Sequence, residues 1–357
     1  MRRGSWRGAA GVLGCVVVAV VSDGAVAQLP RIERLTEIGC EDCGDARQLA
    51  STWDVAVTES GDVMVVDRDA PTLRLFDRTG KPVWGRGRPG AGPGEYRYAM
   101  RAALGRDGVA QVVDMRLRRL TRLAADGSVA QSLPVPFFPA GVAVRRQAGE
   151  LVFLTEDFKG GGTLQRWAQA ADAPVKLAAF DTPLPGSDSF SPSVAVAPNG
   201  DVAYLSSADT YRIHRVSASG AALPEIVRDI PRPHMSAEEI AATQQRMGMV
   251  GGTAKASSEQ TQSGGSKSVL PPARRLDLRP HVSADGLRYD DAGRLWVRTQ
   301  RAVGRTTVFD IFGANGAFVG ELTVPAKVES FALAGSYLAT AGEREDGVPV
   351  VVLWSVR

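Results

Sequence analysis

The chain has 357 residues, of which 44% are hydrophobic and 23% are charged, a composition that fits an ordinary globular protein. Its formal net charge of +3 is too small for the broad basic field that non-specific nucleic-acid binding requires, so we expect no nucleic-acid partner. The 39 glycines and 21 prolines are spread along the chain, which is typical of many short strands joined by turns.

The first 27 residues have the layout of an export signal. A positively charged stretch opens the segment, an apolar stretch follows at 11–21, and an Ala-x-Ala cleavage motif ends it at 25–27. We therefore predict a signal peptide over 1–27 and a mature protein that is exported, either periplasmic or secreted. The apolar stretch is too short for a transmembrane helix and no later segment reaches that length, so we expect no transmembrane anchor after cleavage.

Two cysteines follow the signal peptide, Cys40 and Cys43, in the polar loop 39–45. In an exported protein the default expectation for such a pair is a local disulfide. Free thiols, or a redox or metal role, are the alternatives.

The next segment contains a repeat. An offset of 47 residues places Gly61 on Gly108, Asp67 on Asp114 and Leu73 on Leu120. Between these landmarks the sequence predicts four short strands separated by glycine turns, which is the pattern of one propeller blade. The first unit has its strands near 55–57, 63–66, 73–76 and 81–84.

The same pattern recurs along the rest of the chain. Each unit has a glycine before its second strand, at the following positions: Gly61, Gly108, Gly149, Gly200, Gly293 and Gly335. The last unit has only three strands, so we expect the segment 31–38 to supply the fourth. The sequence therefore predicts an all-β, six-bladed β-propeller of four-stranded antiparallel blades over residues 28–357, with its ring closed by an N-terminal strand.

Several motifs resemble those of NHL-type six-bladed propellers, and of their uncharacterised exported bacterial members. They are the glycine-rich linker GRGRPGAGPGEY at 85–96, the pairs Arg119-Leu120 and Arg212-Ile213, the strand-ending Asp67 and Asp114, and the segment 291–297 with Gly293 and Trp296. The resemblance covers about residues 31–357 and implies the propeller fold. It implies no single function, because the family includes protein-binding, RNA-binding and enzymatic members.

About 50 residues, at 229–279, interrupt the repeat between the fourth and fifth units. Ser236 and Glu239 have the spacing of a helix capping box. The following stretch, 251–268, is rich in Gly, Ser, Thr and Gln and is expected to be disordered. The insertion either caps the central channel or forms a surface excursion without a role.

Candidate ligand-binding residues are the polar side chains expected on the channel face: Asp67, Arg97, Asp114, Arg116, His281 and Arg298. The two aspartates occupy the same repeat position, so each either accepts backbone N–H groups of the adjacent loop or contacts a ligand. The arginines have the chemistry to bind a carboxylate or sulfate group if they converge. No catalytic residue is assigned, since the chain has no nucleophile elbow and no histidine pair at metal-ligand spacing.

We therefore expect a non-catalytic binding or scaffold protein that presents a propeller face to a protein, peptide or glycan, without a resident cofactor. The alternative is a calcium-dependent hydrolase of the lactonase or esterase type, suggested by acidic residues expected near the channel mouth: Asp67, Asp69, Glu95, Asp114, Glu156 and Asp157. Three or more carboxylates converging in the channel would favour the hydrolase. An arginine-rich groove or an apolar channel would favour binding.

Overall fold

The computed structural model describes residues 28–67, 73–105, 107–135, 141–144, 150–156, 161–168, 173–181, 193–207, 210–241, 278–301 and 305–357. The predicted signal peptide at 1–27 and the stretch 251–268 of the insertion lie outside these ranges. None of the described residues belongs to a helix with the length and apolarity that crossing a bilayer requires.

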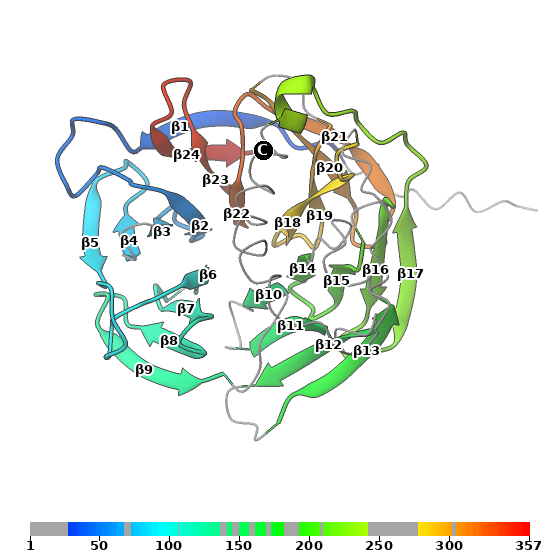
Figure 1. Cartoon of the computed structure of the whole chain (residues 1–357), viewed down its shortest axis with the longest axis horizontal. Helices are drawn as coiled ribbons and strands as arrows, with labels where there is room; N and C mark the ends of the chain where they lie inside the picture. Colours follow the sequence, from blue (N-terminus) through cyan, green and yellow to red (C-terminus); the bar gives the residue numbers. More distant parts are fainter. Residues whose placement is uncertain are drawn as a thin grey trace, which may run out of the picture.

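The described strands form six antiparallel four-stranded sheets arranged as a ring, so the predicted six-bladed propeller is confirmed (Figure 1). Blade 1 contains β2 (Thr52–Val57), β3 (Val63–Asp67), β4 (Leu73–Phe76) and β5 (Pro82–Arg86). Blade 2 contains β6 (Ala99–Leu104), β7 (Ala110–Asp114), β8 (Arg119–Leu123) and β9 (Val129–Pro134). Blade 3 contains β10 (Gly141–Val144), β11 (Glu150–Glu156), β12 (Gly161–Ala168) and β13 (Val175–Asp181).

The second half of the ring has the same arrangement, in which the first strand of each blade lies at the channel and the fourth lies outermost. Blade 4 contains β14 (Ser193–Val196), β15 (Val202–Leu205), β16 (Arg212–Val216) and β17 (Ala222–Val227). Blade 5 contains β18 (Val282–Tyr289), β19 (Leu295–Thr299), β20 (Thr307–Phe312) and β21 (Phe318–Val324). Blade 6 contains β22 (Ser330–Ala334), β23 (Tyr337–Glu343), β24 (Pro349–Val356) and β1 (Ile32–Ile38).

Strand β1 closes the ring, as the sequence predicts. It pairs antiparallel with β24, from Ile32 opposite Val356 to Ile38 opposite Val351, and lies beside it in Figure 1. Backbone hydrogen bonds between Arg31 and Arg357 extend this pairing to the end of the chain. The sheet of blade 6 thus joins the two ends of the propeller, which leaves no incomplete blade.

Tight turns between strands depend on aspartate and glycine. In the turn after β4, Oδ1 of Asp77 accepts hydrogen bonds from the amides of Thr79 (2.9 Å) and Lys81 (3.0 Å). Gly80 in this turn has a φ of 80°, a left-handed conformation that other residues rarely adopt. The hydroxyl and amide hydrogen bonds to the Asp77 carboxylate lower its pKa, with the Thr79 side chain as the largest cause.

The hydrophobic core lies between neighbouring blades. Between blades 5 and 6, Phe309 contacts Trp296 and Phe331 edge-on, at centroid distances of 6.0 and 4.9 Å. Between blades 6 and 1, small aliphatic residues such as Val57 and Ala339 fill the narrower space. Each fully buried large apolar side chain contributes about 1.5–3 kcal/mol, so the interfaces between blades stabilise the ring as a whole.

The two faces of the ring differ in their connections. An antiparallel blade starts its first and third strands at the same end, so the blade-to-blade segments and the loops between second and third strands share one face. We call this the connection face; it includes 39–51, 87–98 and 115–118. The opposite turn face carries the hairpin turns, including 58–62, 77–81 and 290–294.

The described start of the insertion, before residue 242, contains the predicted capping box. The backbone amide of Ser236 donates to Glu239 Oε2 (2.8 Å), and the amide of Glu239 donates to the Ser236 hydroxyl (3.2 Å). A helical turn follows at 237–241.

Candidate functional site

The inner strands of the six blades line a central channel with a cavity of about 130 Å³. Most of its wall is aliphatic, with contributions from Val55, Ala56, Ala102, Ala103, Val142, Ala143, Val144, Val194, Ala195, Val196, Ala332 and Leu333. The charged side chains of Asp54, Arg101 and Arg288 interrupt this wall. Toward the turn face, the lining continues into the residues after β14 and β18, among them Pro198 and Asp291.

A bulge in β18 brings charge into the channel. Val282 pairs with Thr299 and Leu287 with Val297, so β18 has three more residues than β19 between these two pairs. Within the bulge, Asp285 has a φ of 53°. A Cβ on Gly286 would lie 2.6 Å from the carbonyl oxygen of Ser283, so only glycine fits at this position without displacement of the backbone.

The bulge takes part in an ion cluster that spans the ring. Nη2 of Arg101 contacts Oδ1 of Asp285, which connects blade 2 with blade 5 across the channel. Oδ1 of Asp54 lies 3.6 Å from Nη1 of Arg101 and 3.7 Å from Nη2 of Arg288. Blades 2 and 5 stand opposite each other in a six-bladed ring (Figure 1), so the cluster crosses the channel.

Neighbouring groups hold the Asp54 carboxylate in place. Its Oδ2 accepts a hydrogen bond from the amide of Ala102 at 3.0 Å, and its Oδ1 accepts one from the Ser330 hydroxyl at 2.7 Å. Asp54 is 1% exposed, so these hydrogen bonds and the two arginines must offset the free-energy cost of burying its negative charge. The carboxylate therefore connects blades 1, 2, 5 and 6.

Arg298 supports the bulge from the second strand of blade 5. Its Nη2 donates to the carbonyl of Ala284 at 2.8 Å and its Nη1 to the carbonyl of Val328. Burial lowers the pKa of Arg298 and of Arg101 to about 10, and it also lowers the pKa of Arg288. Guanidinium groups remain protonated in proteins at neutral pH. The cluster of Asp54, Arg101, Asp285, Arg288 and Arg298, called the channel cluster below, thus carries three positive and two negative charges.

The structure places Asp67 and Asp114 in equivalent positions at the connection face. Asp67 accepts hydrogen bonds from the amides of Ala50 and Ser51 at 3.0 and 3.2 Å, in the segment that enters its own blade. Asp114 accepts from Arg97 at 2.7 Å and Tyr98 at 3.1 Å in the corresponding segment, and from Leu117 in the next loop at 2.9 Å. Both carboxylates are buried and hold blade connections in place.

The other predicted ligand residues do not form one group. Arg97 and Arg116 are exposed on the connection face of blade 2, where they flank Asp114. His281 is buried in blade 5, its ring 6.0 Å from that of Tyr211. Arg298 lies in the same blade behind the channel bulge, so the structure brings only Arg97, Asp114 and Arg116 together.

The glycine-rich linker is held by the arginine of the following strand. Nη1 of Arg119 donates to the carbonyls of Ala91 and Gly92, both at 3.1 Å, and Nη2 contacts the carbonyl of Glu95. The Glu95 carboxylate accepts from the Gly92 amide (2.8 Å) and from Arg88 (2.7 Å), and the Gly92 hydrogen bond is the largest cause of its lowered pKa. The linker thus forms a compact blade connection.

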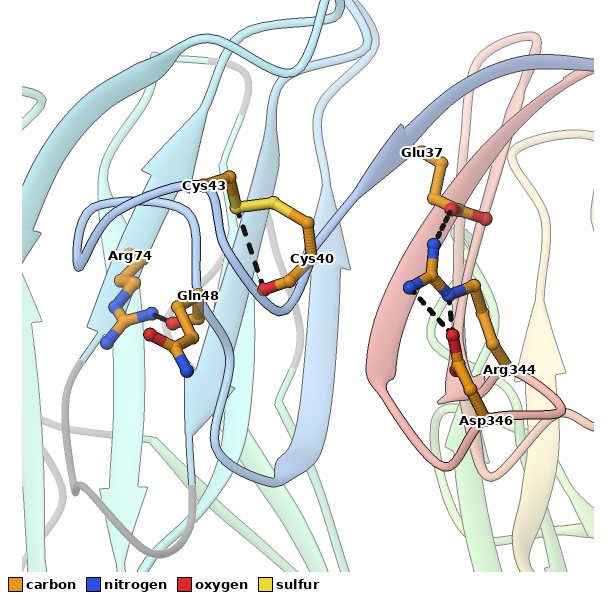
Figure 2. The surroundings of a disulfide bond; sticks show 7 residues. All are labelled: Glu37, Cys40, Cys43, Gln48, Arg74, Arg344 and Asp346. Atoms are coloured by element: carbon orange, nitrogen blue, oxygen red, sulfur yellow. Dashed lines mark hydrogen bonds and ion pairs between the residues drawn. A yellow bond between two sulfur atoms is a disulfide. The ribbon is translucent and has the colours of Figure 1, made fainter.

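The two cysteines form a disulfide in the segment after β1 (Figure 2). Sγ of Cys43 also lies 3.6 Å from the carbonyl oxygen of Cys40. Further along the loop, Arg74 donates to the carbonyl of Gln48, which ties the loop to β4. The disulfide stabilises a connection between the closing strand and blade 1.

The lining of the channel cavity includes three carboxylates, those of Asp54, Asp290 and Asp291. Within the described ranges, no three side chains of His, Cys, Asp or Glu form a group that could hold a metal ion. Of the acidic residues expected at the channel mouth, Asp69 and Asp157 lie outside the described residues, and the side chain of Glu156 is not described.

Four residues of the channel cluster were missed by sequence reasoning: Asp54, Arg101, Asp285 and Arg288. One signal was available, because the offset of 47 residues that relates the first two units places Asp54 on Arg101. A charged residue at the same position of two apolar inner strands indicates an ion pair between neighbouring blades at the channel wall. No local pattern marks Asp285, since its position depends on the bulge.

Comparison with protein-family models finds no match, and comparison with curated proteins finds none either. Among solved structures, a DUF4221-family member from Bacteroides vulgatus aligns with a TM-score of 0.53 and 7% identity, over 92% of this chain and 98% of that one. A protein named as exported, from Bacteroides fragilis, aligns with a TM-score of 0.50 and 12% identity, over 92% and 95%. A gluconolactonase from Xanthomonas campestris aligns with a TM-score of 0.50 and 13% identity, over 86% and 87%. These likenesses show the six-bladed fold and nothing finer.

Proposed function

We propose that this chain is a non-catalytic binding protein that works outside the cytoplasm and presents its connection face to a protein, peptide or glycan bearing acidic groups. The observation that carries the proposal is the pair of exposed arginines, Arg97 and Arg116, on the connection face of blade 2. Guanidinium groups bind carboxylates and sulfates with two parallel hydrogen bonds, which makes them suitable for such a partner.

The backbone under these arginines is firmly held. The buried Asp114 carboxylate accepts hydrogen bonds from the amide of Arg97 and from the amide of Leu117, next to Arg116. Arg119 fixes the linker that precedes Arg97. A surface that is ordered before binding loses less entropy when a partner docks, which supports a recognition role.

Export and family assignment are part of the same proposal. The signal-peptide layout of residues 1–27 supports export to the periplasm or the medium, and the Cys40–Cys43 disulfide suits such an oxidising compartment. The contacts of Arg119 with the glycine-rich linker give a structural role to two motifs of the NHL type and support that assignment.

The test measures binding of a fluorescent polyglutamate peptide and of a sulfated heparin oligosaccharide to purified residues 28–357. The double variant Arg97→Gln/Arg116→Gln should weaken the binding of at least one probe about fivefold, because each exposed ion pair contributes at most about 1 kcal/mol. Arg78→Gln is the matched control, since Arg78 is an exposed arginine in a turn on the opposite face. Equal losses in the control and the double variant, or no binding of either probe, would refute the proposal.

A further inference from the structure

Blade 4 contains a serine, a histidine and a glutamate in one hydrogen-bonded chain. Ser206 directly follows β15, His214 lies in β16 and Glu225 lies in β17, and these three strands are neighbours in the sheet. Oγ of Ser206 lies 3.1 Å from Nε2 of His214, and Nδ1 of His214 lies 2.6 Å from Oε1 of Glu225. A hydroxyl within hydrogen-bond reach of a base, which is itself oriented by an acid, is the arrangement that activates a serine as a nucleophile.

The glutamate sets the tautomer that a base requires. An ionised carboxylate only accepts hydrogen bonds, so in the neutral ring Nδ1 of His214 carries the proton and Nε2 keeps its lone pair toward Ser206. Burial by itself would raise the pKa of Glu225, but the hydrogen bonds from Arg212 and His214 outweigh this effect and lower it. Glu225 is therefore ionised at neutral pH and orients the ring for proton transfer from the serine.

The histidine ring is held in place and is still accessible. Tyr204, its partner across β15 and β16, stacks on the ring at a centroid distance of 5.0 Å and an interplanar angle of 27°. Phe180 of blade 3 lies beside Tyr204, with 5.2 Å between the ring centroids. The side chains of His214 and Glu225 are 23% and 37% exposed, and Ser206 is half-buried, so a small molecule can approach the serine. The two aromatic rings provide an apolar surface near it.

We propose that Ser206 is a nucleophilic acceptor site, which takes the acyl group of an ester whose acyl part is small and apolar. Oγ of Ser206 attacks the carbonyl carbon of the ester while Nε2 of His214 takes the hydroxyl proton. The bond between the carbonyl carbon and the alcohol oxygen then breaks, and the alcohol leaves with the proton held by His214. The products are an acylated serine and a free alcohol.

This site differs from the proposed partner surface in place and in chemistry. It lies in blade 4, whereas Arg97 and Arg116 lie on the connection face of blade 2. A single transfer to each chain requires no turnover, so it is compatible with a non-catalytic binding protein. Either proposal can fail without the other.

The experiment treats purified residues 28–357 with a fluorescent alkyl fluorophosphonate and locates the label by peptide mass spectrometry. An activated serine forms a P–O bond with this probe as the P–F bond breaks, and the adduct is stable enough to be counted. One label per chain, on Ser206, is expected. Ser206→Ala should abolish labelling, and Ser219→Ala is the matched control, because Ser219 is an exposed serine that contacts Ser217 instead of a histidine. No label, or label only on other residues, would overturn the proposal.

Two further variants test the roles of the partners. His214→Gln should slow labelling at least about 100-fold, because it removes the base. Glu225→Gln should slow it at least about tenfold, because the new amide can donate to Nδ1 and move the ring proton to Nε2. Nitrogen-15 NMR of the His214 ring reports this change of tautomer, which a merely structural role of Glu225 would not cause. Unchanged labelling rates in both variants, with melting temperatures equal to that of the unchanged protein, would also overturn the proposal.

An acyl donor tests the proposed ligand class. p-Nitrophenyl acetate should acetylate Ser206 and release at least one equivalent of p-nitrophenolate that Ser206→Ala does not release. Absence of any release that depends on Ser206 would overturn the acyl-acceptor role. Release well beyond one equivalent would support acylation and would refute the non-catalytic part of the proposed function.

Discussion

At the scale of single residues, Asp54 and Arg101 occupy the same position in the inner strands of blades 1 and 2 yet carry opposite charges. Equivalent positions of two neighbouring repeats therefore supply the two partners of one ion pair. Both side chains are at least nine-tenths buried, and the Asp54 carboxylate accepts hydrogen bonds from blade 2 and from blade 6. Here the blades are held together by ion pairs and hydrogen bonds, whereas elsewhere in the core they are held together by apolar contacts.

We expect Asp54→Asn to destabilise the protein by about 3–5 kcal/mol, because it leaves buried arginine charge without a partner. Urea unfolding followed by tryptophan fluorescence measures this change in the free energy of unfolding. Ser330→Ala removes only one hydrogen bond to the same carboxylate and should cost about 1 kcal/mol. A smaller effect for Asp54→Asn than for Ser330→Ala would show that Asp54 does not balance the arginines.

The sequence predicted the structural residues of the repeat better than the channel residues. Asp67 and Asp114 recur at one repeat position, and the structure gives both the same role toward backbone amides. The binding role considered for them stays a prediction. Arg298 and Arg97 were grouped because both were expected on the channel face, and the structure separates them because Arg97 lies in the connection before β6 whereas Arg298 is buried behind the bulge of β18.

At the scale of elements, the bulge of β18 determines the chemistry of the channel. Without its additional residues, Asp285 would not reach Arg101 on the far side of the ring. Gly286 permits the bulge because a Cβ at this position would lie 2.6 Å from the carbonyl oxygen of Ser283 and 2.9 Å from that of Arg298.

Gly286→Ala should therefore destabilise the protein by about 1–3 kcal/mol, since the added methyl group has to displace backbone. Gly85→Ala is the matched control, because a Cβ at Gly85 would meet no atom within 4 Å. Thermal unfolding of both variants checks the prediction. A melting temperature for Gly286→Ala equal to that of the control would contradict the close packing of the bulge.

At the scale of the whole molecule, the ring is closed by the pairing of its first and last strands. Strand β1 completes blade 6 through its pairing with β24, and residues near it, such as Leu29 and Ile32, pack against the apolar cluster between blades 5 and 6. Removal of this strand exposes the edge of β24 and part of that cluster.

Deletion of residues 28–38 should lower the melting temperature of the entire domain and broaden its transition, because each blade is stabilised by both neighbours. Circular dichroism during heating measures this effect. Leu35→Thr, at a half-exposed position of the same strand, should change stability by no more than about 0.5 kcal/mol. A deletion variant that melts cooperatively at the unchanged temperature would refute closure by β1.

The sequence by itself determined the fold of this protein, because each blade is built from local signals. Alternating apolar residues, glycine turns and strand-ending aspartates lie within one repeat of about 47 residues, and even the closing strand follows from a count of strands in the last unit. Only the tertiary structure decided the channel cluster. Asp54, Arg101 and Arg288 lie far apart in the chain and meet because the ring brings their inner strands together around one axis, which no local pattern encodes.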